Sequence, residues 1–331
     1  MANGTEKSKC LINISDFSLS GESRLESGKK ERLSLSVPKL SLKEGEITAV
    51  IGGSGCGKSV LLSLIMGCPA FGVGGRLNFA EFSQFGELMP TNAFRNVCSA
   101  ARWRRQLRKS GELFYLPQFF PVARAQQQNT LDMMLQVVEA LASRNRILKK
   151  GIGKKFRDKF EKYRLTDVLG KNIAELSGGE RRRAELIARI VAMEISRRPG
   201  LLVLDEPTTG FDPVNAIEFV REVKFAVDEL CSDGICAGAV ITTHEMKCLD
   251  DVVGDGERCE RVIDRVCVVH GVHKEDEVNC RVVFDGLAGD VWRQFFEDDK
   301  QRTFANDGSS LFERVKDVCE ANANRGRSHH A

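Results

Sequence analysis

The order of apolar and polar residues divides the chain into short strands and amphipathic helices. Apolar and polar residues alternate in 10–19 and in 33–42, which predicts an antiparallel β-layer with a polar loop at 21–32. Residues 47–51 (ITAVI) are continuously apolar and largely β-branched, as in a strand buried on both faces. Residues 113–116, 201–204 and 239–243 are further short apolar strands. Together with the helices below, these strands predict an α/β core.

Helical spacing of apolar residues appears in the middle of the chain. Residues 130–142 show it, and a helix that opens at Ser177 carries one apolar stripe until Pro199 and Gly200 end it. Asp212 followed by Pro213 is typical of a helix N-cap and first turn. We interpret residues 119–176 as a helical insertion into the α/β core.

The remaining segments predict β-structure and then a tail. Residues 76–82 have the pattern of a strand, and residues 261–269 and 281–284 that of a hairpin interrupted by a charged loop at 273–277. The chain is polar after residue 299, which is typical of a poorly ordered tail. We therefore expect one main domain at 1–300, with a helical subdomain at about 119–180, and a tail at 301–331.

Composition limits the kind of protein. Of the 331 residues, 42% are hydrophobic, and the 49 basic and 46 acidic residues leave a net charge of +3, which does not favour a nucleic-acid binder. No apolar run approaches the 18 residues or so of a membrane span, and the N-terminus lacks the apolar core of a signal peptide. The 11 cysteines show no C-x-x-C or zinc spacing, so we interpret them as reduced, mostly buried thiols of a cytosolic protein.

A glycine-rich loop between the strand at 47–51 and a helix from residue 58 to 66 matches G-x-x-x-x-G-K-[ST], the pattern of a phosphate site. Its residues are Gly52, Gly53, Ser54, Gly55, Cys56, Gly57, Lys58 and Ser59. Glycines let successive N–H groups turn toward an anion, and the helix N-terminus adds positive potential. Lys58 can reach the β- and γ-phosphates, and the Ser59 hydroxyl can bind Mg²⁺. The structural alternative is a glycine turn before a core helix, which a complete match in this setting disfavours.

Two further motifs follow the phosphate loop. The strand at 201–204 ends in Asp205 and Glu206, which suit water-mediated Mg²⁺ binding and deprotonation of an attacking water, respectively. Ser177, Gly178 and Gly179 at a helix start form a second anion-binding surface.

With LSGGE at 176–180, the chain resembles the ATP-binding cassette (ABC) family over about residues 10–295. The resemblance implies a RecA-like P-loop NTPase core, an antiparallel β-subdomain and an inserted α-helical subdomain. It implies that Gln118 binds Mg²⁺ and couples nucleotide state to a partner. It also implies that His244 contacts the γ-phosphate and positions Glu206. Ser177 and Gly179 would contact the γ-phosphate of the opposite protomer, with Asp212 at the dimer interface.

The resemblance favours an Mg²⁺-dependent ATPase subunit that powers transport through separate membrane-spanning subunits. Such a subunit forms a homodimer or heterodimer around ATP and lies on the cytoplasmic face of a membrane; direct nucleic-acid binding is not expected. The run GGERRR resembles ATPases of lipid and lipopolysaccharide exporters. A soluble ABC ATPase of translation or nucleic-acid maintenance is the alternative, kept open by basic stretches at 102–109 and 144–164. A kinase is the weakest interpretation, because it does not need LSGGE.

Three features depart from the family pattern. Gly21 falls where an aromatic residue usually stacks on adenine, while the nearby Phe17 has the parity of a core residue. The stretch between Lys58 and Gln118 is long, and the charged segment 273–277 interrupts the terminal hairpin. For the basic stretch at 144–164 we favour a solvated helix face over a phospholipid or nucleic-acid contact.

Overall fold

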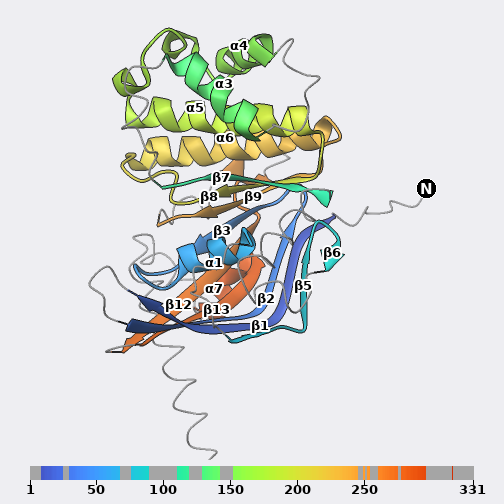
Figure 1. Ribbon diagram of the computed structural model, residues 1–331, viewed down its shortest axis with the longest axis vertical. Helices are drawn as coiled ribbons and strands as arrows, with labels where there is room; N and C mark the ends of the chain where they lie inside the picture. The colour runs from blue at the N-terminus through green and yellow to red at the C-terminus, as the bar shows by residue number, and fades with distance from the viewer. Residues whose placement is uncertain are drawn as a thin grey trace, which may run out of the picture.

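The computed structural model describes residues 9–24, 30–67, 76–88, 110–118, 129–141, 152–244, 249, 252–253, 260–274, 277–295 and 315. Within these residues an eleven-stranded sheet curls around helix α1, with a helical layer above one part of the sheet (Figure 1). The strands, in sheet order, are β6 (Glu87–Leu88), β5 (Glu81–Gln84), β1 (Cys10–Arg24), β2 (Lys30–Lys43), β13 (Glu277–Leu287), β12 (Arg265–Lys274), β3 (Ile47–Ile51), β9 (Ala237–Thr242), β8 (Gly200–Leu204) and β7 (Glu112–Leu116). Strand β4 (Arg76–Asn78) pairs with β1, and β10 (Val252–Val253) forms a separate pair with β11 (Glu260–Arg261).

The N-terminal strands β1 and β2 confirm the predicted antiparallel layer but are longer than expected. Their pairing continues from Gly21↔Leu33 to Arg24↔Lys30, so the prediction of a loop at 21–32 is wrong for residues 21–24 and 30–32, which are strand. The pairing skips Asp16 and Pro38, where Asp16 adopts a φ of 48°. Proline has no N–H to donate, and such an irregularity is where a strand tolerates it.

The strands β3, β9, β8 and β7 are neighbours and run parallel. Every residue of β3, β8 and β9 is buried, as their apolar runs predicted. The carboxyl ends of the four strands meet at one edge of the sheet, where ligands bind in open α/β sheets.

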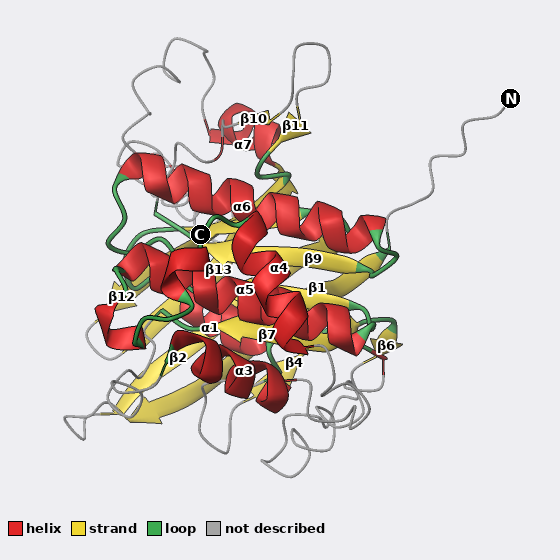
Figure 2. Cartoon of the chain, turned by 90° about the horizontal axis from the view of Figure 1, so that it is seen from above, coloured by secondary structure: helices red, strands yellow, loops and turns green. Residues whose placement is uncertain are grey.

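Helices cover the two faces of this parallel sheet unequally. Figure 2 looks down on the helical layer, formed by α3 (Thr130–Leu141), α4 (Ile152–Lys162), α5 (Gly178–Ser196) and α6 (Pro213–Ser232). The short 3₁₀ helices η2 (Thr166–Val168) and η3 (Ile173–Glu175) lead from α4 to α5. Helix α1 (Lys58–Ile65) packs on the other face, and α7 (Ala288–Phe295) follows β13.

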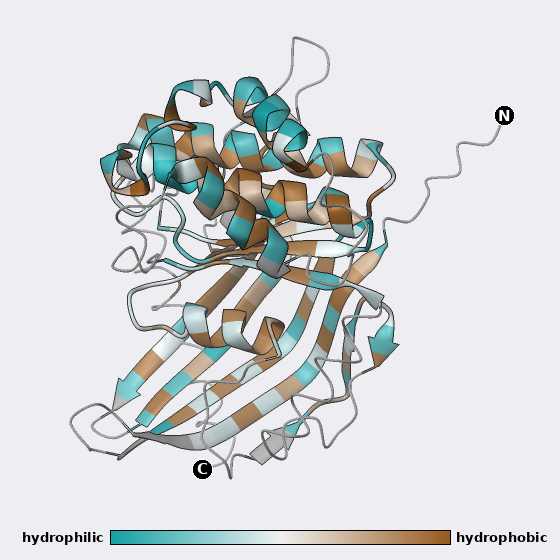
Figure 3. Cartoon of the chain, turned by 45° about the horizontal axis from the view of Figure 1, so that its top comes forward, coloured by the Kyte–Doolittle hydropathy of each residue, from teal (hydrophilic) through white to brown (hydrophobic). Residues whose placement is uncertain are grey.

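Two apolar clusters form the core. One joins α3, α4, α5 and α6 to the parallel strands, and the other surrounds α1 within the curl of β1, β2, β12 and β13. Strands of the curl alternate between hydrophobic and hydrophilic residues, as Figure 3 shows. Phe17 lies in the second cluster and is 1% exposed, which confirms its predicted core position.

Helix α4 contains most of the described part of the basic stretch, and three of its four lysines form ion pairs within the chain. Lys159 Nζ lies 2.6 Å from Glu194 Oε1 and 2.8 Å from Glu229 Oε1. Burial lowers the pKa of Lys159, but the two carboxylates raise it by more. Lys162 also pairs with Glu229, at 2.8 Å. These contacts agree with a structural role for this helix face, although Lys159 is buried rather than solvated.

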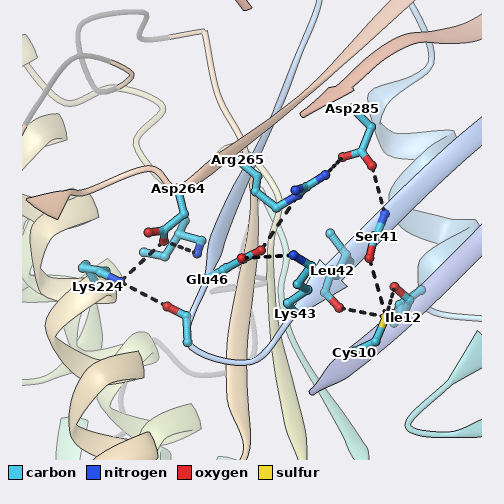
Figure 4. A network of polar contacts seen from close by, with 12 residues as sticks. Cys10, Ile12, Ser41, Leu42, Lys43, Glu46, Lys224, Asp264, Arg265 and Asp285 are labelled. Atoms are coloured by element: carbon cyan, nitrogen blue, oxygen red, sulfur yellow. Dashed lines mark hydrogen bonds and ion pairs between the residues drawn. The ribbon is translucent and has the colours of Figure 1, made fainter. Parts of the chain in front are cut away.

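A polar network fixes the beginning of β3, the strand that leads to the phosphate loop (Figure 4). Asp264 Oδ2 accepts a hydrogen bond from Ile47 N at 2.7 Å and lies 3.5 Å from Lys224 Nζ on α6. Beside it, Arg265 and Asp285 pair at 3.0 Å between β12 and β13. Burial raises the pKa of both aspartates. The network therefore ties α6, β12 and β3 together below the site.

Two other predictions need correction. Residues 76–82 form not one strand but β4 and the start of β5, with a break at 79–80. The terminal hairpin exists, but β12 runs to Lys274 and β13 starts at Glu277, so most of the charged "loop" is strand. The basic cluster at 102–109 and almost all of the tail lie outside the described residues.

Candidate functional site

The P-loop (residues 52–59) leaves the carboxyl end of β3 and enters α1 through residues that need glycine. Gly55 has a φ of 74° and Gly57, the N-cap of α1, a φ of 102°. These left-handed conformations are strained for other residues. A Cβ on Gly52 would collide with the Val269 carbonyl oxygen, and a Cβ on Gly57 with Cys280. The loop is therefore close-packed and needs glycine at these positions, as in loops whose backbone N–H groups can bind an anion.

Lys58 lies inside this loop and is 6% exposed. Its Nζ donates to Gly52 O at 3.0 Å and to Gly53 O at 3.1 Å. Ser59 follows on the first turn of α1 and is exposed. The lysine ammonium is therefore held inside the loop by two carbonyl groups, a position that suits binding of a phosphate chain.

Asp205 and Glu206 follow β8 at the same sheet edge, and both are held by Thr242 at the end of β9. The Thr242 hydroxyl donates to Asp205 Oδ1 at 2.8 Å and accepts from Glu206 N at 2.6 Å. Glu206 has a φ of 43°, which is rare for a residue with a side chain. Strain of this kind concentrates at functional sites.

Glu206 brings together side chains from three neighbouring strand ends. Gln118, which follows β7, donates from Nε2 to Glu206 Oε2 at 2.7 Å. His244, which follows β9, lies with Nε2 2.9 Å from Glu206 Oε1. The structure therefore brings the predicted catalytic residues Glu206, Gln118 and His244 into contact, next to the strand that leads to the P-loop.

The signature residues lie on α5, on the other side of the sheet from α1. Ser177 caps α5: its Oγ accepts from Glu180 N at 3.2 Å, and its N donates to Glu180 Oε2 at 2.8 Å. This backbone hydrogen bond lowers the pKa of Glu180. Asp212 caps α6 through hydrogen bonds from Val214 and Asn215, as Pro213 at the first helical position predicted. Ser177, Gly178 and Asp212 are exposed, and none is in hydrogen-bond contact with the P-loop among the described residues.

The side chains at the ends of these strands suit Mg²⁺ and a nucleoside triphosphate. The Ser59 hydroxyl, the Asp205 carboxylate and the Gln118 amide oxygen are all oxygen donors, which Mg²⁺ prefers. In the described part of the chain, no three His, Cys, Asp or Glu side chains cluster as a metal site of their own. Oxygen donors of this kind suit a Mg²⁺ ion that is shared with substrate phosphates.

Sequence patterns missed residues that hold the site from behind. Tyr115 OH lies 3.4 Å from Asp205 Oδ2, and burial, with the Asp205 charge, raises the pKa of Tyr115 so that it stays a donor. Arg182 Nη1 donates to the Pro117 carbonyl at 2.7 Å, which links α5 to the residue before Gln118. For Thr242 the only signal in the sequence was a hydroxyl side chain at the end of an apolar strand.

The fold and the glycine-rich loop define the class of P-loop nucleoside triphosphatases. The family model "ABC transporter" matches residues 35–209, more than half of the chain. The L-cystine import ATP-binding protein TcyC of Bacillus subtilis is 29% identical over 65% of this chain and 76% of its own length. The lipopolysaccharide export system ATP-binding protein LptB of Escherichia coli is 27% identical over 71% of this chain and 83% of its own length.

A solved structure agrees with this assignment. The ATP-binding subunit of an ABC transporter has a TM-score of 0.55 and 20% identity, covering 93% of this chain and 99% of its own. This chain belongs to the ABC transporter family. It is an ABC-type ATPase with a RecA-like P-loop fold, of the kind that powers transport as an ATP-binding subunit. Among the described residues, no helix is both long and apolar enough to cross a membrane.

Proposed function

We propose that this chain binds MgATP on the P-loop and hydrolyses it with Glu206 as the general base. The observation that carries the proposal is the pair of hydrogen bonds that join Gln118 and His244 to Glu206, at 2.7 Å and 2.9 Å. They gather three candidate catalytic side chains at the strand edge that holds the P-loop.

Each residue has a distinct role in this proposal. The N–H groups of residues 52–59 and the Lys58 ammonium hold the phosphate chain. Ser59, Gln118 and Asp205 provide oxygens for Mg²⁺, which neutralises charge on the phosphates when bound. Glu206 accepts the proton of the attacking water, and His244 orients Glu206 and contacts the γ-phosphate.

We also propose that the working unit is a dimer, homomeric or heteromeric. The N-termini of α1 and α5 lie on opposite sides of the parallel sheet, so Ser177, Gly178 and Gly179 do not face the P-loop of their own chain. In a two-fold dimer, the signature of one protomer covers the ATP of the other. Asp212, exposed at the start of α6, would then lie at the interface.

The chain would act as a transport ATPase attached to separate membrane-spanning subunits on the cytoplasmic face of a membrane. The relatives that support this are ATP-binding proteins of an importer and of an exporter. In domain terms, we propose one nucleotide-binding domain at 1–300 that includes a helical subdomain at about 119–180, with a separate tail at 301–331.

Mixing two inactive variants tests the dimer and the site together. Lys58→Ala removes a phosphate ligand, and Ser177→Arg blocks the γ-phosphate of the opposite site. A mixed dimer has one site with both changes and one with neither, so mixing should restore part of the ATPase activity. Normal ATPase activity of Ser177→Arg alone, in the native assembly, would refute the dimer proposal.

Fractionation tests the transport role. We expect the chain in the membrane fraction, co-purifying with a polytopic subunit. A chain that follows ribosomes or DNA instead would support the soluble alternative and refute the transport role.

A further inference from the structure

The extended hairpin β12–β13 supports the P-loop along much of its length. Val269, Gly271 and His273 are alternate residues of β12 and face the same side of the sheet. The Val269 carbonyl lies against Gly52, and a Cβ on Gly271 would stand only 2.6 Å from Cys56 Cα. His273 continues the row, with Nε2 3.2 Å from Gly55 O. The P-loop backbone is therefore packed on the hairpin at several points.

The contact of His273 with Gly55 has a definite polarity. A carbonyl oxygen only accepts hydrogen bonds, so Nε2 of His273 is the donor and carries the proton. A Cβ on Gly55 would lie 3.1 Å from this nitrogen, so the imidazole packs directly on the glycine. Gly55 has a φ of 74°, a conformation that lets its carbonyl turn outward to the histidine.

The orientation of this carbonyl matters for phosphate binding. In a trans peptide the C=O and the following N–H point to opposite sides. With the Gly55 carbonyl held on the hairpin, the N–H of Cys56 points across the loop and donates a long hydrogen bond to Gly53 O, at 3.3 Å. A P-loop binds anions through such inward N–H groups. The hydrogen bond from His273 thus favours the peptide orientation that keeps the Cys56 N–H on the inner side of the loop, where a phosphate can replace its long contact with Gly53.

We propose that His273 is a positioning residue of the nucleotide site, which raises affinity for the phosphate chain by holding the Gly55 carbonyl outward. The proposal rests on ATP binding at the P-loop, as proposed above. It gives a function to a segment that the sequence pattern indicated to be a charged interruption of the hairpin.

The test must separate this role from stacking of the ring on the nucleotide base at the same face of the sheet. The strand register connects Gly21 with Leu33, Leu33 with Val278, and Val278 with His273, so His273 lies in the same row as the position without the stacking aromatic. If the ring stacks on adenine, its replacement lowers the affinity for ATP but not for inorganic triphosphate. If His273 positions the P-loop, its replacement lowers the affinity for both ligands.

The experiment compares binding of MgATP and of magnesium tripolyphosphate to the full chain by titration calorimetry. His273→Ala and His273→Phe both remove the donor, and Phe keeps a ring. His273→Gln keeps an N–H donor. Val272→Ala, at a neighbouring position that is 42% exposed, is the matched control. We expect Ala and Phe to weaken both ligands about tenfold, the loss typical of one hydrogen bond. Gln should stay within about threefold of wild type, and the control should bind like wild type.

Three results would overturn the proposal: unchanged affinity of His273→Ala for both ligands, a loss confined to ATP, or failure of Gln to recover binding. Since His273 is exposed, the melting temperature without ligand should not change. Should the Ala variant not fold, the contrast between Gln and Phe carries the same test. A wild-type chain that binds neither ligand would refute the proposed function itself, whereas unaffected variants of a binding chain refute only the role of His273.

Discussion

Replacing Glu206 by glutamine should stop ATP hydrolysis while leaving the site assembled. Glutamine keeps the size of the side chain: its amide oxygen can still accept the hydrogen bond from Gln118, and His244 can change tautomer to accept from its NH₂ group. The side chain is 22% exposed, so we expect less than about 1 kcal/mol of lost stability. The amide cannot accept the proton of water, and loss of a general base lowers a rate by roughly 10²–10⁴. This corresponds to about 3–5 kcal/mol in the activation free energy.

The assay is single-turnover hydrolysis with protein in excess over ATP, alongside ATP binding and thermal unfolding of the same preparation. We expect a rate about 10²–10⁴-fold below that of wild type, which is the loss typical of a missing general base, and an unchanged affinity for ATP. A rate within a few-fold of wild type would show that Glu206 is not the base.

A pair of control variants tests whether the backbone at Glu206 is strained. Alanine and glycine both remove the carboxylate, but only glycine tolerates the φ of 43° without strain. The left-handed conformation costs other residues about 1–2 kcal/mol, partly offset by the greater unfolded-state entropy of glycine. We therefore expect Glu206→Gly to unfold at a higher temperature than Glu206→Ala, with both inactive. Equal or reversed melting temperatures would contradict the strain argument.

The other predictions concern binding, stability and reactivity. Lys58→Ala should weaken ATP affinity directly, because the positive charge inside the P-loop is lost; unchanged affinity in a binding titration would contradict this. Lys159→Met should destabilise the chain by about 2 kcal/mol in chemical unfolding, since it leaves buried Glu194 with only the more distant lysine. Because the pKa of Lys159 is raised in the folded chain, the stability contributed by its ion pairs is complete below about pH 10.5 and declines above it. An equal loss of stability at all pH values would argue that Lys159 contributes by packing alone. Burial raises the pKa of Cys56, so at pH 8 iodoacetamide should modify exposed Cys10 faster, by mass spectrometry, and the rate at Cys56 should rise with pH; a faster Cys56 would refute the buried-thiol assignment.

The sequence alone was enough for features that depend on a few adjacent residues. A phosphate loop, an N-cap such as Asp212 before Pro213, and the capping residue Ser177 are local: their conformation depends on glycine φ angles and on hydrogen bonds to the next helical turn. The fully apolar runs of β3 and β8 likewise indicated buried parallel strands, because few other structures bury every residue of a short segment. The family resemblance rests on the same local motifs.

Tertiary structure decided what depends on partners far apart in the chain. The polar residues at 21–24 resemble a loop, yet pairing with β2 satisfies their backbone groups and makes them strand. His273 lies in a segment with the composition of a charged turn, but the length of the hairpin brings it to Gly55, 218 residues away in the sequence. Thr242 is an ordinary strand residue until β9 lies beside β8 and its hydroxyl meets Asp205. In each instance the cause is a long-range contact, and the spacing of polar and apolar residues along the chain carries no record of which distant segment supplies it.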